Sequence, residues 1–184
     1  MKNTQAEIIE SNNARAGGRI GIGSEPDFVI TALTAPATGR PGSAFSASIQ
    51  VCNQGTESAE TDVELLLSQD EVITSPAGPG WDGDASLGRF SAGYLTRGQC
   101  RTVPVMATLP SSVPKRELRL GAIVDSRQLK PELIESNNVY LGGVVGVGQE
   151  LDFVITELKT APSVNGGGSF DVTLTVCNQG FMSG

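Results

Sequence analysis

The chain repeats itself at a fixed spacing of 125 residues. Residues 7–55 align with residues 132–180 without a gap, and 24 of these 49 positions are identical. Several matches at one spacing are the sequence signature of a tandem repeat, in which each repeat is one structural unit. The longest identical stretches pair residues 9–13 with 134–138, 27–31 with 152–156, and 51–55 with 176–180.

The repeat length determines how the chain is divided. Because the chain has 184 residues, it holds one whole repeat and parts of two others. We expect residues 1–25 to be the C-terminal end of a preceding repeat, residues 26–150 to be one complete repeat, and residues 151–184 to be the N-terminal strands of a following, truncated repeat. A short natural protein with ragged ends is the alternative. A unit of 125 residues is long enough to bury a core of its own.

The composition excludes several classes of function. The formal net charge is −7 and no Lys/Arg cluster is present, which argues against binding to nucleic acid or to an anionic membrane surface. The absence of histidine removes Ser-His-Asp and Cys-His catalysis as well as histidine-ligated zinc. No apolar run approaches the ~20 residues that a transmembrane helix needs, so we expect no membrane insertion.

Short stretches of alternating apolar and polar residues separated by turns indicate β-strands throughout the complete repeat. Nothing in the chain has a sustained helical period. We therefore predict an all-β fold, an immunoglobulin-like antiparallel β-sandwich of about seven strands. The sequence predicts a loop over 35–42, a longer loop over 68–86 and a turn at 91–93. Strands are predicted at residues 27–33, 45–52, 63–67, 88–90, 103–109, 118–124 and 142–148.

Two cysteines occupy strands that are neighbours in an immunoglobulin-like sheet. Cys52 ends one strand and Cys100 begins another, and each lies on the face opposite the apolar residues of its strand. We predict a Cys52–Cys100 disulfide on the sheet surface, with two free thiols as the alternative. The disulfide would stabilise the fold by about 4 kcal/mol, because it lowers the chain entropy of the unfolded state. The partner of Cys177 would lie at position 225 (100 + 125), so we expect Cys177 to be unpaired by truncation.

The order of five short motifs resembles the CARDB domain, the cell-adhesion-related domain found in bacteria. The resemblance covers about residues 26–140, and it implies an extracellular immunoglobulin-like sandwich that occurs in tandem within large surface or secreted proteins, sometimes beside enzyme domains. The family has no agreed catalytic residues. This chain departs from the commoner pattern in its cysteine pair and in residues 76–84. The motifs are Pro26–Ile30, Val51–Gly55, Glu64–Asp70, Ala122–Asp125 and Glu132–Asn138.

One loop contains the candidate binding residues. Asp70, Asp82 and Asp84 supply carboxylate oxygens of the kind that calcium binds, and solvated loop carboxylates are the alternative. We favour the solvated reading, and we expect no other cofactor. Trp81 is the only tryptophan, and it is a candidate contact for a partner or a sugar ring; a packing role at the end of the sandwich is the favoured alternative.

Three functions follow from these features. The first is a non-catalytic extracellular or cell-surface repeat, a spacer or filament-forming unit in a larger bacterial protein, whose partners are neighbouring repeats. Homotypic strand pairing through residues 14–23 or 151–176 is expected to accompany it. The second is a carbohydrate- or protein-binding module that uses the Trp81 loop. The third, an enzyme, is disfavoured because no carboxylate pair has neighbours that would poise it for catalysis.

Overall fold

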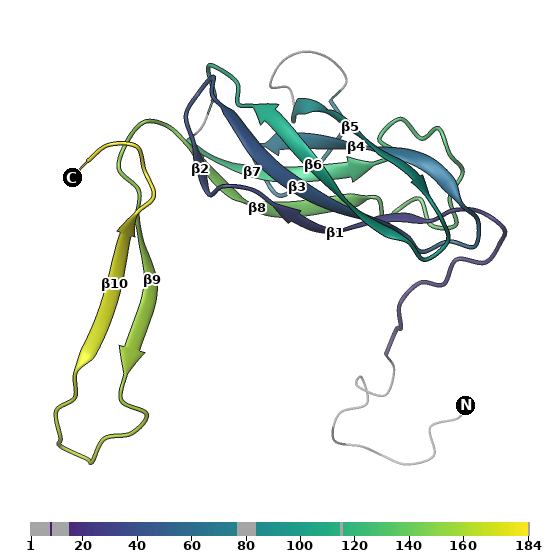
Figure 1. Cartoon of the computed structure of the whole chain (residues 1–184). Helices are drawn as coiled ribbons and strands as arrows, with labels where there is room; N and C mark the ends of the chain where they lie inside the picture. Colours follow the sequence, from purple (N-terminus) through teal and green to yellow (C-terminus); the bar gives the residue numbers. More distant parts are fainter. Residues whose placement is uncertain (1–7, 9–14, 77–83, 115, 184) are drawn as a thin grey trace.

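The computed structural model describes residues 8, 15–76, 84–114 and 116–183, and every regular element in them is a β-strand (Figure 1). The part of the chain described here has no helix able to span a membrane. The ten strands are β1 (Phe28–Thr34), β2 (Thr38–Gly39), β3 (Ala44–Asn53), β4 (Ala59–Ser68), β5 (Ala85–Leu95), β6 (Cys100–Thr108), β7 (Glu117–Val124), β8 (Val139–Val147), β9 (Phe153–Thr160) and β10 (Val172–Asn178).

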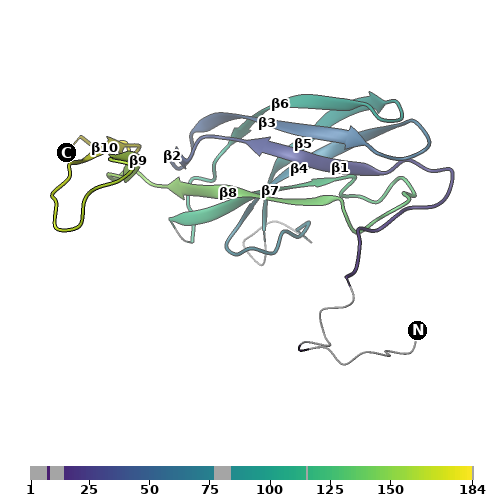
Figure 2. The same ribbon diagram turned by 90° about the horizontal axis from the view of Figure 1, so that it is seen from below.

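Strands β1 to β8 form a sandwich of two sheets, which confirms the predicted immunoglobulin-like fold. One sheet has the order β1-β3-β6 and the other has the order β2-β8-β7-β4-β5. All neighbours are antiparallel except β2 and β8, which pair in parallel over two positions. Figures 1 and 2 show the β9–β10 hairpin at one end of this sandwich and the segment of residues 15–27 at the other.

The core lies between the two sheets and follows from the alternation along their strands. Phe28, Ile49 and Val51 from the first sheet have no exposed surface, and they face Leu65 and Leu67 from the second, which have none either. Leu66 has the opposite parity and is nevertheless buried, in a second cluster with Ile73 and Ile123. The chain that follows β4 therefore covers the outer face of the sheet locally.

Two local expectations were wrong. A short strand at 88–90 followed by a turn at 91–93 was predicted, yet β5 runs unbroken to Leu95. Gly93 has a φ of 67° next to the register shift between Thr61 and Asp62, so it forms a bulge that lets the strand continue. The predicted loop 35–42 contains β2, because Thr38 and Gly39 pair with the end of β8.

The cysteines pair as predicted. Cys52 of β3 lies directly opposite Cys100 of β6 and the two form a disulfide, so the bridge links neighbouring strands of one sheet and does not cross the core. Pro104 is exposed on β6, which is an edge strand of this sheet, where the missing backbone N–H of proline is tolerated. Cys177 is a free and exposed thiol.

Replacing both Cys52 and Cys100 by serine should lower the free energy of unfolding by about 4 kcal/mol, because a loop of 48 residues is no longer closed in the unfolded chain. Urea unfolding followed by tryptophan fluorescence and circular dichroism measures the change. Cys177→Ser is the matched control and should leave the stability unaltered. A double variant as stable as the parent chain would contradict the prediction.

Candidate functional site

The β9–β10 hairpin reproduces the pairing of β1 with β3. Phe153 lies opposite Asn178 as Phe28 lies opposite Asn53, and every later pair keeps the same correspondence at a spacing of 125 residues. Both ladders also shift register at the same place, between Ile30 and Ala32 in the first and at the matching step in the second. The shared register means that the hairpin presents the same side chains on the same face as the first sheet.

A buried asparagine explains the repeated Val-Cys-Asn-Gln-Gly motif. Asn53 Oδ1 accepts hydrogen bonds from the backbone N–H of Asp27 at 3.2 Å and of Gly55 at 3.0 Å, while its Nδ2 donates to the Glu57 carbonyl at 2.8 Å. A Cβ atom at Gly55 would overlap the backbone of Pro26 and Asp27. The motif therefore clamps the end of β3 to the segment before β1, a role that the repeated sequence alone did not indicate.

The second copy of the motif makes the same hydrogen bonds. Asn178 Oδ1 accepts from Asp152 N–H at 3.1 Å and from Gly180 N–H at 3.0 Å, and its Nδ2 donates to the Met182 carbonyl at 2.7 Å. A Cβ atom at Gly180 would overlap the backbone of Glu150 and Asp152. The hairpin is thus anchored to the linker that joins it to the sandwich.

Three side-chain contacts join the sandwich to the hairpin. The Thr38 hydroxyl donates to the Gln179 carbonyl at 2.7 Å, and Arg116 forms an ion pair with Glu150 at 2.9 Å. The Arg40 guanidinium lies 4.6 Å from the centre of the Phe181 ring. A cleft of about 400 Å³ lies in this junction, and its lining includes Val144, Val147, Leu151 and Phe181. This junction, between the β2–β8 edge and the hairpin, is the principal candidate site.

Acidic and amide residues of the recurring motifs meet at the opposite end of the sandwich. Glu132 accepts a hydrogen bond from Phe28 N–H and another from Asn138 Nδ2 at 2.8 Å, and Asn137 Nδ2 donates to Asp27 at 2.9 Å. Burial raises the pKa of Glu132 to about 7. Asn138 is buried, and its Oδ1 has no hydrogen-bond partner. A protonated Glu132 can donate to that amide oxygen after a rotation of the Asn138 side chain.

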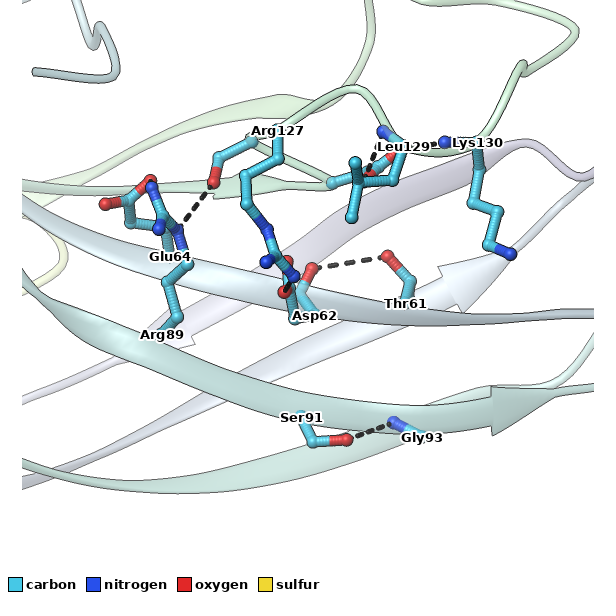
Figure 3. A network of polar contacts seen from close by, with 11 residues as sticks. Thr61, Asp62, Glu64, Arg89, Ser91, Gly93, Arg127, Leu129 and Lys130 are labelled. Atoms are coloured by element: carbon cyan, nitrogen blue, oxygen red, sulfur yellow. Dashed lines mark hydrogen bonds and ion pairs between the residues drawn. The ribbon is translucent and has the colours of Figure 1, made fainter. Parts of the chain in front are cut away.

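A second polar network lies on the outer face of the larger sheet (Figure 3). Glu64 is buried and accepts hydrogen bonds from Ser86 at 2.6 Å, from Arg89 at 3.1 Å and from Ser75 at 3.2 Å. Burial raises the pKa of Glu64, but the Ser86 hydrogen bond and the charge of Arg89 outweigh it and hold the pKa below its ordinary value. Arg127 forms a neighbouring ion pair with Asp62. The charges in this network are paired with each other, which favours a structural role.

Two of the three predicted metal ligands, Asp70 and Asp84, already have hydrogen-bond partners within the chain. Asp70 accepts a hydrogen bond from Val72 N–H at 2.8 Å, and the buried Asp84 accepts one from Thr74 N–H at 2.6 Å. Asp82 and Trp81 lie outside the described residues. Within the described residues no three acidic, histidine or cysteine side chains are grouped to hold a metal ion. Calcium binding at Asp70, Asp82 and Asp84 stays a prediction, as does the Trp81 contact.

The burial of Glu132 should make stability depend on pH. Because its folded pKa of about 7 exceeds its unfolded value of 4.5, the folded state binds the proton more tightly, and stability should fall as pH rises from about 4.5 to 7. The contribution of this one group is about 3 kcal/mol at most. Glu132→Gln should remove this slope and stabilise the fold above pH 7, as measured by urea unfolding at several pH values. An unchanged slope in the variant would contradict this assignment.

Arg89→Met should destabilise the fold by about 2 kcal/mol at neutral pH, because it leaves a buried carboxylate without its charged partner. The matched double variant, Glu64→Gln with Arg89→Met, removes that charge and should recover much of the loss. Chemical unfolding of the parent, single and double variants gives the coupling energy, and additive effects would show that the two side chains do not interact.

Comparisons with known proteins give one family match and several similar solved structures. The CARDB family model matches residues 25–141. Similar solved structures include the CARDB domain of a Pyrococcus furiosus protein in complex with di-metal ions (18% identity, 67% of this chain and 90% of that chain, TM-score 0.48). They also include a domain of a proposed cell surface protein from Methanosarcina acetivorans (22% identity, 68% of this chain and 95% of that chain, TM-score 0.47).

A β-glucosidase from Listeria innocua is also similar, but the match covers only 16% of that enzyme (14% identity, 67% of this chain, TM-score 0.45). No curated protein matches the chain. Because the family match spans most of the sandwich, from the segment before β1 into β8, this chain belongs to the CARDB family of non-catalytic, cell-adhesion-related domains.

Proposed function

We propose that this chain is a structural and adhesive repeat of a larger extracellular or cell-surface protein, a spacer or filament-forming unit with no catalytic role. The observation that carries the proposal is the equivalence of the β9–β10 pair to the β1–β3 pair at a spacing of 125 residues. A following repeat that starts with the same strand register supports an array in which each unit contacts the next and is held in position by it.

The linker between the sandwich and the hairpin supports a fixed spacing. Val147 ends β8 and Phe153 begins β9, and the residues between them are held by hydrogen bonds on both sides. Gly148 N–H donates to the Gly39 carbonyl at 3.1 Å, and Phe181 N–H donates to the Glu150 carbonyl at 3.0 Å. A linker with so little slack holds neighbouring units in a semi-rigid arrangement, as a spacer requires.

The disulfide supports an extracellular place of action. Cys52–Cys100 links two strands that already pair, and such bridges persist in secreted and surface proteins but not in a reducing cytosol. Membership in a cell-adhesion-related family points the same way.

The proposal can be tested by completing the second repeat. Gly184 occupies the repeat position of Ala59 (184 − 125 = 59), so residues 60–150 fused after Gly184 supply the missing strands. The fused chain should form a second disulfide between Cys177 and the copy of Cys100, and the amides of β9 and β10 should become protected from hydrogen exchange. Peptide mapping and exchange measurements on both chains check this, and a titratable Cys177 thiol in the fused chain would contradict the repeat.

The spacer role needs a second measurement on the same fused chain. Small-angle X-ray scattering should give one well-defined longest dimension, because the junction fixes the angle between the repeats. The control is a variant with a glycine-serine insertion after Gly148, which should broaden the distribution of dimensions. Identical scattering from both chains would contradict a semi-rigid spacer.

A further inference from the structure

The β9–β10 hairpin leaves an apolar face uncovered. Phe153, Ile155 and Val176 are 62%, 60% and 57% exposed, whereas their repeat equivalents Phe28, Ile30 and Val51 are 0%, 7% and 0% exposed in the sandwich core. Phe170, Val172 and Leu174 continue the exposed face. The hairpin therefore displays the inner surface of a sheet without the sheet that covers it.

Residues 15–22 correspond in sequence to a strand but are not part of any sheet. They are the repeat equivalents of 140–147 in β8, and in the structure they form no strand. Ile20 and Ile22 are 85% and 93% exposed, although their equivalents Val145 and Val147 are buried in the core at 3% and 2%. The glycines also coincide: those at 17, 18, 21 and 23 match those at 142, 143, 146 and 148. The chain thus carries both an uncovered sheet face and the strand that covers such a face.

We propose that the hairpin of one copy of this chain accepts residues 15–22 of a second copy, in the position that β8 holds beside β1 and β2. The proposal rests on the repeat equivalence in the proposed function and adds a partner to it. Because the two surfaces differ, the contact is head to tail, so one copy can donate a segment and accept another, and successive copies can add to a growing assembly.

The sandwich supplies the pattern for this contact. β8 pairs in parallel with β2, with Gly146 N–H donating to the Ala37 carbonyl at 2.8 Å and Gly148 N–H donating to the Gly39 carbonyl at 3.1 Å. The corresponding bonds between two copies run from Gly21 to Pro162 and from Gly23 to Val164. Proline retains the carbonyl that the first bond needs. Val164 is exposed and belongs to no strand, so the edge is open.

The geometry of the chain favours a second copy over closure within one chain. Figure 1 shows residues 15–25 at one end of the sandwich and the hairpin at the other. Arg19 also donates a hydrogen bond to Ser136, which holds its segment beside the end of its own sandwich and leaves Ile20 and Ile22 uncovered. A donated segment would therefore place its own sandwich where the next repeat of an array would stand.

The charges of the two surfaces are complementary. Residues 15–22 contain Arg15 and Arg19 and no acidic residue. Residues 151–178 contain three carboxylates, Asp152, Glu157 and Asp171, against the single Lys159, which gives −3 + 1 = −2. Association between copies should consequently weaken as salt is added, while the apolar contacts persist.

Light scattering on the full chain tests the contact, in a Cys177→Ser background that removes the free thiol. The weight-average mass should rise above the monomer mass of 19.1 kDa as concentration increases. Replacing Ile20 and Ile22 by aspartate should return the chain to a monomer without changing the melting temperature of the sandwich. Ile8→Asp is the matched control, since Ile8 is equally exposed but lies outside the donated segment, and it should assemble like the parent chain.

Cross-linking identifies the contact itself. A chain carrying Ile22→Cys mixed with one carrying Val164→Cys should form a disulfide between the two chains, because Val147 and Gly39 are paired in the sandwich. A strict monomer at every concentration overturns the proposal, as does a cross-link only between two copies of Val164→Cys, which indicates hairpins packed face to face.

The fused chain described above separates this failure from that of the proposed function. It carries its own copy of β8, so it should be monomeric and should not accept a donated segment. If the 184-residue chain is monomeric while the fused chain forms its second disulfide, strand donation is wrong and the repeat stands. If the fused chain assembles as strongly as the parent, the hairpin is not the acceptor.

Discussion

The pairing register of β3 is the constraint on which most of the molecule depends. This strand lies between β1 and β6, and five of its ten residues, Ser48–Cys52, pair on both sides. The register turns Ile49 and Val51 into the core, sets Cys52 opposite Cys100 on the outer face, and brings Asn53 to the backbone of Asp27. A slip of one residue would reverse all three at once, because side chains alternate between the faces of a strand. Core, disulfide and clamp therefore support one another.

Sequence patterns predicted the parts of this structure that depend on the alternation of buried and exposed side chains along a strand. The sandwich and the cysteine pair followed from the parity of residues such as Val51 and Cys52. The turn expected at Ser91–Gly93 was wrong because a bulge at Gly93 resembles a turn in sequence. The pairing of Tyr94 and Leu95 with β4 shows that the strand continues beyond the bulge. β2 was missed because two residues are too short for an alternating pattern.

The polar groups were harder to predict because they depend on residues far apart in sequence. Glu132 meets Phe28 across 104 positions, and Glu64 meets Arg89 across 25. The recurrence of Glu135–Asn138 was visible in the sequence, but it did not indicate which residues these side chains contact. Nothing in a single copy of the motif reveals that Glu132 is enclosed beside Asn138. The junction contacts of Thr38 and Arg40 were likewise invisible, since they join segments about 140 residues apart.

The intra-sheet disulfide has a mechanical consequence. The chain enters the sandwich near Phe28 and leaves it near Val147 at the opposite end (Figure 1), so tension along an array would pull the two ends of the sandwich apart. The chain between Cys52 and Cys100, which are 48 positions apart, cannot be extended by tension while the disulfide is intact. At ~3.3–3.6 Å per extended residue, an unfolded domain with an intact disulfide is about 160 Å shorter than one without it. An oxidised array would therefore lengthen less per unfolding event than a reduced one, and would keep the β3–β6 pair joined for refolding.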